Sequence, residues 1–158
     1  MASQFIHITL PDGTRKQVPA GCTVREALTP EGGRLDAKVL AAKINGEPRD
    51  LSCPLEQDAT IEPLTFESAE GREVYRHSST HIMAQAVKEV FPTAQLTIGP
   101  ALDDGFYYDF AFDRPFTPED LEKIEARAIE IMKRGLTVTR SELSKQDAIK
   151  FFQERGEG

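Results

Sequence analysis

The pattern of hydrophobic and polar positions predicts a β-rich unit over residues 4–65. Apolar residues alternate with polar ones at 6–10, which is the period of a half-buried strand, and residues 11–14 (Pro-Asp-Gly-Thr) have the chemistry of a turn. Residues 23–26 (Thr-Val-Arg-Glu) form a capping box that predicts a short helix. Strands are expected at 6–10, 15–18, 39–44 and 59–64, with a tight turn at Asn45-Gly46 after the third strand. A hairpin, a helix and short strands within about 60 residues predict a β-grasp (ubiquitin-like) fold.

The second part of the chain has the period of helices, so the whole is assigned to the α+β class. Apolar residues recur at helical spacing over about 72–91, and Thr117 followed by Pro118 marks the start of another helix. The buried face of that helix is predicted from Leu121, Ile124, Ala128 and Ile131. Further predictions are a hairpin at 96–102 and 106–110, a strand at 136–139 and a last helix after Ser144. The domain prediction is 1–65, a linker at 66–72, and 73–158.

Composition and charge narrow the function classes. The chain has 158 residues, 39% hydrophobic and 28% charged, without an apolar run near the ~20 residues of a membrane span. The N-terminus has no basic segment followed by an apolar core, so no signal peptide is predicted and a cytoplasmic location is expected. Cys22 and Cys53 match no zinc spacing and are predicted to be free thiols. A net charge of -7 argues against a broad basic surface for nucleic acid, although a site for an RNA end remains possible.

His77 and His81 are the main candidate chemical residues. Four positions apart on a helix, they share one face, and the apolar stripe of the same helix lies on the opposite side. A zinc site would need a further ligand, and Ser78 stands where a metalloprotease motif has glutamate. A hydrolytic site without metal could use imidazoles to orient water and transfer protons. The third interpretation is a solvated helix face, which Gln85 and Lys88 on the same side of the helix favour. The spacing of the two histidines by itself favours this interpretation over the two functional ones.

Gly99 and Tyr108 are a second candidate pair, in the predicted hairpin. Phe106, Tyr108 and Phe110 share one face of the second strand by alternation. One interpretation is that these aromatics pack on the helices while Gly99 permits a close approach. The other is that the Tyr108 hydroxyl and the Gly99 backbone form the wall of a pocket that faces the histidines.

Three blocks of sequence carry a resemblance to a known family. Residues 76–81 (Arg-His-Ser-Ser-Thr-His), 95–100 (Gln-Leu-Thr-Ile-Gly-Pro) and 104–109 (Asp-Gly-Phe-Tyr-Tyr-Asp) closely resemble the N-terminal region of bacterial threonyl-tRNA synthetases. Residues 4–65, with Leu-Pro-Asp-Gly at 10–13 and Ala-Lys-Ile-Asn-Gly at 42–46, resemble the TGS domain of that family. The resemblance implies an N-terminal fragment, in which a β-grasp TGS domain precedes an incomplete α+β editing domain.

The resemblance also implies a function. The editing domain of the family hydrolyses seryl-tRNA(Thr); His77 and His81 correspond to its first histidine pair, and Tyr108 and Gly99 to pocket residues. A Cys-x-x-x-His motif and a lysine complete the site in the family and have no counterpart here, so the fragment alone is expected to be inactive. The implied parent is a class II threonine–tRNA ligase that forms a homodimer. The implied partner of the editing domain is the 3′ end of tRNA(Thr), and no membrane partner is expected. No cofactor is expected in this fragment, whereas ATP, magnesium and zinc belong to the catalytic core.

Two alternatives from other classes stay open. TGS domains also occur in GTPases and stringent-response regulators, so the chain could be a non-catalytic interaction or regulatory module with solvated histidines. A zinc hydrolase built on His77 and His81 is the other. Continuation of the natural chain into a Cys-x-x-x-His segment and a class II core would exclude the module, and metal analysis would test the hydrolase.

Overall fold

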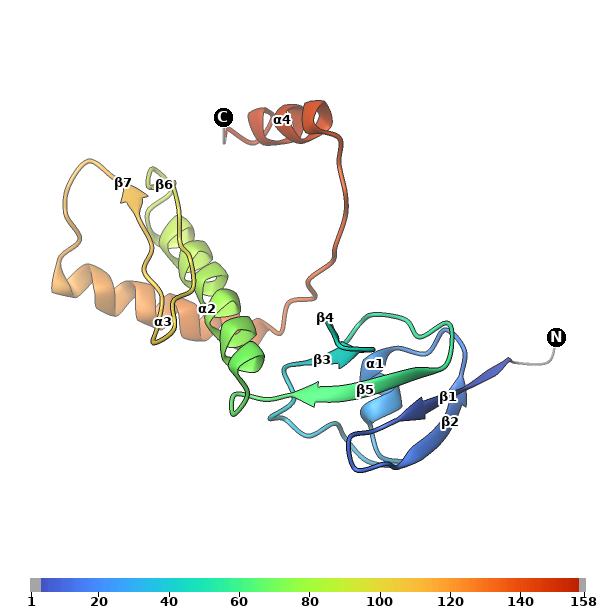
Figure 1. The fold of residues 1–158 in the computed structure, drawn as a ribbon. Helices are drawn as coiled ribbons and strands as arrows, with labels where there is room; N and C mark the ends of the chain where they lie inside the picture. The colour runs from blue at the N-terminus through green and yellow to red at the C-terminus, as the bar shows by residue number, and fades with distance from the viewer. Residues whose placement is uncertain (1–3, 157–158) are drawn as a thin grey trace. The chain divides into compact units, whose positions relative to one another are not determined.

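The computed structural model describes residues 4–156, in two compact units that meet within helix α2, between His77 and Ser78. The outer limits of the two predicted domains, residues 1 and 158, lie outside the described residues. The elements in chain order are β1 Phe5–Thr9, β2 Arg15–Pro19, α1 Val24–Leu28, β3 Ala41–Ile44, β4 Glu47–Arg49, β5 Ala59–Leu64, α2 Ala69–Val90, β6 Gln95–Leu96, β7 Phe110–Ala111, α3 Pro118–Arg134 and α4 Lys145–Gln153 (Figure 1).

The first unit is built on a mixed five-stranded sheet in the order β2-β1-β5-β3-β4. β1 pairs antiparallel with β2 and parallel with β5, whereas β3 runs antiparallel to both of its neighbours, β5 and β4. Parallel pairing of the first and last strands requires a crossover connection, and α1 lies within it. This topology confirms the predicted β-grasp fold, and β4 is a strand that the sequence pattern did not predict.

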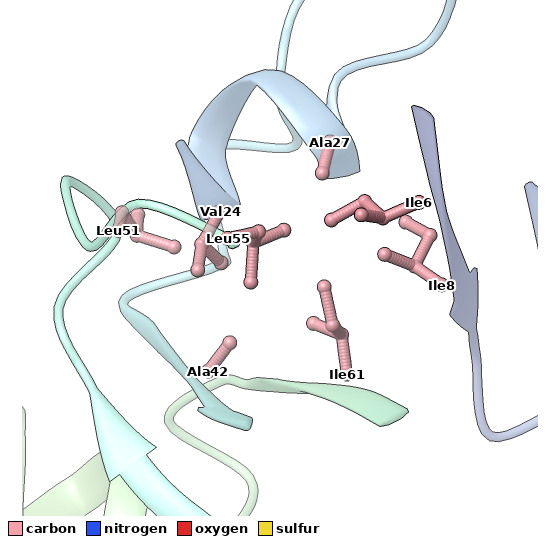
Figure 2. Packing of buried hydrophobic residues seen from close by; sticks show 8 residues of the cluster. All are labelled: Ile6, Ile8, Val24, Ala27, Ala42, Leu51, Leu55 and Ile61. Atoms are coloured by element: carbon pink, nitrogen blue, oxygen red, sulfur yellow. The ribbon is translucent and has the colours of Figure 1, made fainter. Parts of the chain in front are cut away.

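The core of the β-grasp unit lies between α1 and the inner face of the sheet (Figure 2). Alternation places Ile6 and Ile8 of β1 on that face, where they are 3% and 0% exposed, and Ile61 of β5 joins them at 1%. Val24 and Ala27 point into the same cluster from α1. A short helix can hold these positions because its predicted capping box forms: Glu26 N–H donates to Thr23 Oγ1, and Thr23 N–H donates to Glu26 Oε2.

The turns that join the strands follow their residue chemistry. Asn45 and Gly46 both have positive φ, 51° and 87°, as a two-residue hairpin turn with the twist of the flanking strands requires. Leu10 N–H donates to the carbonyl of Thr14 at 2.8 Å, and Gly13 lies between them with φ of 82°. Both predicted turns are therefore confirmed.

In the second unit, the C-terminal part of α2 and α3 share a hydrophobic cluster. Its buried members are Ala86, Val87, Ala94, Ile124 and Ile131. Partly buried rings of Phe91, Phe110, Phe112 and Phe116 pack against this cluster. Arg134 of α3 donates from both terminal nitrogens to the Glu89 carboxylate of α2, each at 2.9 Å, which ties the ends of the two helices together.

The prediction that Leu121 is buried is wrong. Leu121 is 57% exposed, while Ile124 and Ile131 are buried as expected and Ala128 is partly buried. The buried residue in the first turn of α3 is instead Asp120, which closes a capping box with Thr117 and receives a hydrogen bond from Arg114 at 2.5 Å. These bonds satisfy the carboxylate and allow a charged side chain to take the inward position.

The predicted strand at 136–139 is also wrong. Residues 137–144 have no strand hydrogen bonding, Leu136 is 55% exposed and Val138 is 91% exposed. A single extended segment forms a strand only where a neighbour accepts and donates its backbone hydrogen bonds, and no described segment does so here. Helix α4 forms as predicted behind the N-cap Ser144, but none of its residues is buried.

Candidate functional site

His77 and His81 lie on exposed positions of α2, as their spacing predicts. The helix packs through other positions, with Ala84, Ala86 and Val87 all buried and Ile82 and Met83 partly buried. Helix α2 begins at Ala69, earlier than the predicted start near residue 72. The imidazoles are exposed, but buried residues of the same helix lie close beside them: Thr80, three residues after His77, is 1% exposed, and Ala84, seven residues after His77, is 4% exposed.

His81 lines a cavity of about 420 Å³ in the second unit. Ser78, His81 and Gln85 supply polar groups from α2, at the spacing of successive helical turns. The other lining residues are Ile82, Ile131, Met132, Gly135, Leu136 and Val138. Gly135 ends α3 in the left-handed conformation with φ of 57°, which turns the chain so that the residues after it reach the cavity. A hydroxyl, an imidazole and an amide from α2 thus line the cavity together with mostly apolar side chains from α2, α3 and the segment after it.

Gly99 and Tyr108 lie in direct contact. A Cβ atom on residue 99 would fall 2.1 Å from Cδ2 and 2.5 Å from Cε2 of Tyr108, so only glycine leaves room for this ring. The Tyr108 ring also stacks on the Phe110 ring, with the two ring centroids 4.7 Å apart. The predicted close approach at Gly99 and the shared face of Tyr108 and Phe110 are both observed.

A bulge in the hairpin places these two residues. Leu96 pairs with Phe110 and Ala101 with Phe106, so the first strand carries one residue more than the second between these pairs. Asp109 N–H donates to the carbonyl of Ile98 at 2.8 Å beside the bulge. Thr97 N–H also donates to the Asp109 carbonyl, at 3.2 Å, so Thr97 and Ile98 together face Asp109 and the extra residue directly precedes Gly99. The regular strands expected at 96–102 and 106–110 are therefore shortened to β6 and β7 with an isolated bridge.

The candidate residues fall into two local groups: His81 in the lining of the cavity, and Gly99 in contact with Tyr108. Among the described residues, the lining of the 420 Å³ cavity includes His81 but not His77, Gly99 or Tyr108. Ser78 and Gln85 were not predicted as members of this group, although their spacing of three and four residues from His81 is a signal that sequence carries. No group of three or more His, Cys, Asp or Glu side chains within residues 4–156 is arranged to hold a metal ion.

The two cysteines belong to the first unit. Cys22 and Cys53 are both free, as predicted; they are half-buried and pack against the β-grasp core. Burial raises the pKa of the Cys22 thiol, and the charge of Glu26 raises it further. A raised pKa disfavours the thiolate, the reactive form, so the position fits a core side chain.

Comparison with known protein families first identifies the domain formed by the N-terminal part of the chain. The family model described as the TGS domain matches residues 6–65, which are the β-grasp unit of this structure. The fold and the family match agree on this domain.

The relatives then extend the match to nearly the whole chain. It is 53% identical over 155 residues to the threonine–tRNA ligase of Symbiobacterium thermophilum, covering 98% of this chain and 24% of that protein. It is 48% identical to the enzyme of Citrifermentans bemidjiense and 47% to that of Acetivibrio thermocellus, over 96% and 97% of this chain and 24% of each relative. The chain is therefore homologous to the N-terminal region of threonine–tRNA ligases and contains their TGS domain. It spans about a quarter of the length of these relatives.

The helices of residues 4–156 include none with the length and apolar character that crossing a bilayer requires.

Proposed function

We propose that this chain belongs to a threonine–tRNA ligase and that its second unit serves the hydrolysis of seryl-tRNA(Thr). The observation that carries the proposal is His81, exposed on α2 and lining a cavity with Ser78 and Gln85, in a chain homologous to threonine–tRNA ligases. A cavity lined by a few polar groups among apolar side chains suits the recognition of a small aminoacyl group.

Physical chemistry explains why such a ligase needs a second site. A synthetic pocket that admits threonine also admits serine, because one missing methyl group changes binding by only about 1–3 kcal/mol. A separate site that accepts serine and clashes with the threonine methyl group supplies the remaining discrimination.

The proposed chemistry is hydrolysis of the ester that joins serine to the tRNA 3′ end. His77 and His81 position a water molecule and accept its proton as the water oxygen attacks the ester carbonyl. Backbone and side-chain donors stabilise the oxyanion that develops, and the ribose oxygen leaves with a proton. Tyr108 and Gly99, which are not among the residues that line the His81 cavity, are proposed as a separate contact surface for the aminoacyl end of the tRNA. Their contact sets the position of the ring, and Phe110 supports it.

The remaining assignments concern the parent protein. We propose a class II ligase that acts in the cytoplasm as a homodimer, with ATP, magnesium and zinc bound in its catalytic core rather than by these residues. The 3′ end of tRNA(Thr) is the partner proposed for the second unit. Identity of 46–53% with relatives named threonine–tRNA ligase supports these assignments.

The test is serine release from seryl-tRNA(Thr) by a chimera, in which this chain replaces the matching region of the Symbiobacterium thermophilum ligase. His77→Ala and His81→Ala are each expected to lower the rate about 100-fold or more, the usual contribution of positioned acid–base groups. His7→Ala is the matched control, since His7 lies on β1 of the TGS unit. Serine release that survives the double substitution in the chimera would refute the histidine roles. Release equal to wild type after deletion of the whole second unit would favour the non-catalytic module.

A further inference from the structure

We propose that residues 65–72, here called the β5–α2 joint, form a rigid connection that fixes the first turns of α2 against the β-grasp sheet. Lys43 and Gly71 are its key positioning residues, and His77 is the group that they position. The proposal concerns residues of the first unit only, and its functional part rests on the proposed editing activity.

Hydrogen bonds and a close backbone approach hold the chain between β5 and the first turn of α2. Ser68 donates to the carbonyl of Thr65 from both its N–H, at 3.1 Å, and its hydroxyl, at 3.0 Å. The same hydroxyl accepts the Gly71 N–H at 3.1 Å, which caps the first turn of α2. A Cβ atom on Gly71 would lie 1.8 Å from the Thr65 carbonyl oxygen, so the helix backbone sits directly on the end of β5. Gly71 is buried in this contact.

An ion pair ties the first turn of α2 to the middle of the sheet. Lys43 Nζ of β3 lies 2.6 Å from Glu70 Oε1, and the Lys43 side chain is only 20% exposed. Its hydrogen bond lowers the pKa of Glu70, which keeps that carboxylate charged. Lys43 is also 3.9 Å from Glu62 Oε1 on β5, so one cation links two strands and the helix. A partly buried cation with two anionic partners is more restricted than an isolated surface pair.

Two further contacts restrain the loop between β5 and α2. Arg72 Nη1 donates to the carbonyl of Glu67 at 2.9 Å, from the helix back to the loop. The rings of Phe66 and Tyr75 meet edge to face with centroids 5.2 Å apart. Tyr75 lies two residues before His77, so the ring contact restrains the helix almost as far as the histidine.

These contacts explain the residue types at the joint. Glycine lowers helix stability relative to alanine, so an exposed glycine in a first turn would be a poor choice. Here it permits the helix to approach the Thr65 carbonyl. The expected effect of Gly71→Ala is therefore opposite in sign to the effect predicted from helix propensity.

The first test is hydrogen exchange of the 158-residue chain. Gly71→Ala is expected to speed exchange of the amides at 69–77 by roughly tenfold or more. Gly105→Ala is the matched control, because its Cβ would meet nothing within 4 Å and its φ is not positive. Exchange at 69–77 that is unchanged or slower in Gly71→Ala would overturn the rigid joint.

A double-mutant cycle on the ion pair tests the same proposal without overpacking the joint. Lys43→Met and Glu70→Gln are each expected to speed exchange at 69–77 by roughly two- to fivefold, and the double variant by no more than Lys43→Met alone, which already removes both ion pairs of Lys43. Lys43→Arg keeps the charge and should keep the protection. Additive effects, or no effect of the single changes, would overturn the role of the ion pair. This test remains valid even if Gly71→Ala unfolds the whole unit.

The positioning role is tested separately by kinetics in the chimera described above. Gly71→Ala is expected to lower kcat for serine release by roughly tenfold or more, with KM within about twofold, because a displaced catalytic group affects the chemical step more than binding. Faster exchange with unchanged kcat would overturn the positioning of His77 and leave the proposed editing activity intact. If His77→Ala lowers kcat but Gly71→Ala does not, the positioning role of Gly71 is likewise overturned while the role of His77 in editing stands.

Discussion

Replacing Ile61 by alanine should remove a large share of the stability of the β-grasp unit. Ile61 is 1% exposed and lies on β5, facing Ile8, Leu55 and α1 (Figure 2). Truncation of a buried isoleucine to alanine costs about 2–5 kcal/mol, through lost transfer free energy and the cavity that remains. A unit of about 60 residues has a free energy of unfolding of only about 3–9 kcal/mol. Ile61→Val removes one methylene group and should cost about 0.5–1.5 kcal/mol.

Hydrogen exchange of the amides in β1 and β5 measures these changes unit by unit. Because 1.4 kcal/mol corresponds to a factor of ten, Ile61→Val should speed exchange by about two- to tenfold, and Ile61→Ala by about 30-fold or more. Ile149→Val is the matched control: Ile149 is 48% exposed on α4, so exchange in β1 and β5 should not change. Exchange within twofold of wild type in Ile61→Ala would refute the core as described.

The remaining predictions concern the start of α3. Thr117→Ala removes the acceptor of the Asp120 N–H and should cost about 1 kcal/mol in thermal unfolding, whereas Thr117→Ser should cost much less. An equal effect of the two substitutions would refute the cap. Arg114 lowers the pKa of Asp120, with help from the Thr117 N–H, so this carboxylate stabilises the fold above the ordinary aspartate pKa of about 3.9. That contribution falls as the pH drops below about 5 towards the lowered pKa. Unfolding followed from about pH 6 to pH 3 should therefore show less acid loss of stability in Asp120→Asn than in wild type. Equal acid sensitivity would contradict the pairing.

The β-grasp unit could be predicted because its local signals agree with its tertiary structure. Alternation at 6–10, the capping box at Thr23 and the Asn45–Gly46 turn each correspond to an observed feature. Strand β5 spans Ala59–Leu64, the range expected from its pattern. The missed strand β4 contains Pro48 and is exposed throughout, so it lacks the apolar alternation that marks a half-buried strand.

The second unit was harder to predict because its packing depends on distant partners. The buried Asp120 carboxylate is satisfied by Arg114 as well as by the Thr117 N–H, and spacing along α3 carries no sign of the Arg114 contact. The bulge beside Gly99 depends on pairing between residues far apart in the hairpin. Periodicity predicted that His77 and His81 point away from the core, and the structure confirms that both are exposed, although Thr80 and Ala84 on the same side of α2 are buried. Their catalytic roles, and those of Tyr108 and Gly99, remain predictions.

The most direct measurement compares two substrates in the chimera: serine release from seryl-tRNA(Thr) and threonine release from threonyl-tRNA(Thr), in single turnovers at saturating enzyme. Proofreading predicts serine release much faster than threonine release, with the preference lost together with the rate in His77→Ala and His81→Ala. Equal rates on the two substrates, or a preference for serine that survives both substitutions, would contradict an editing site on α2.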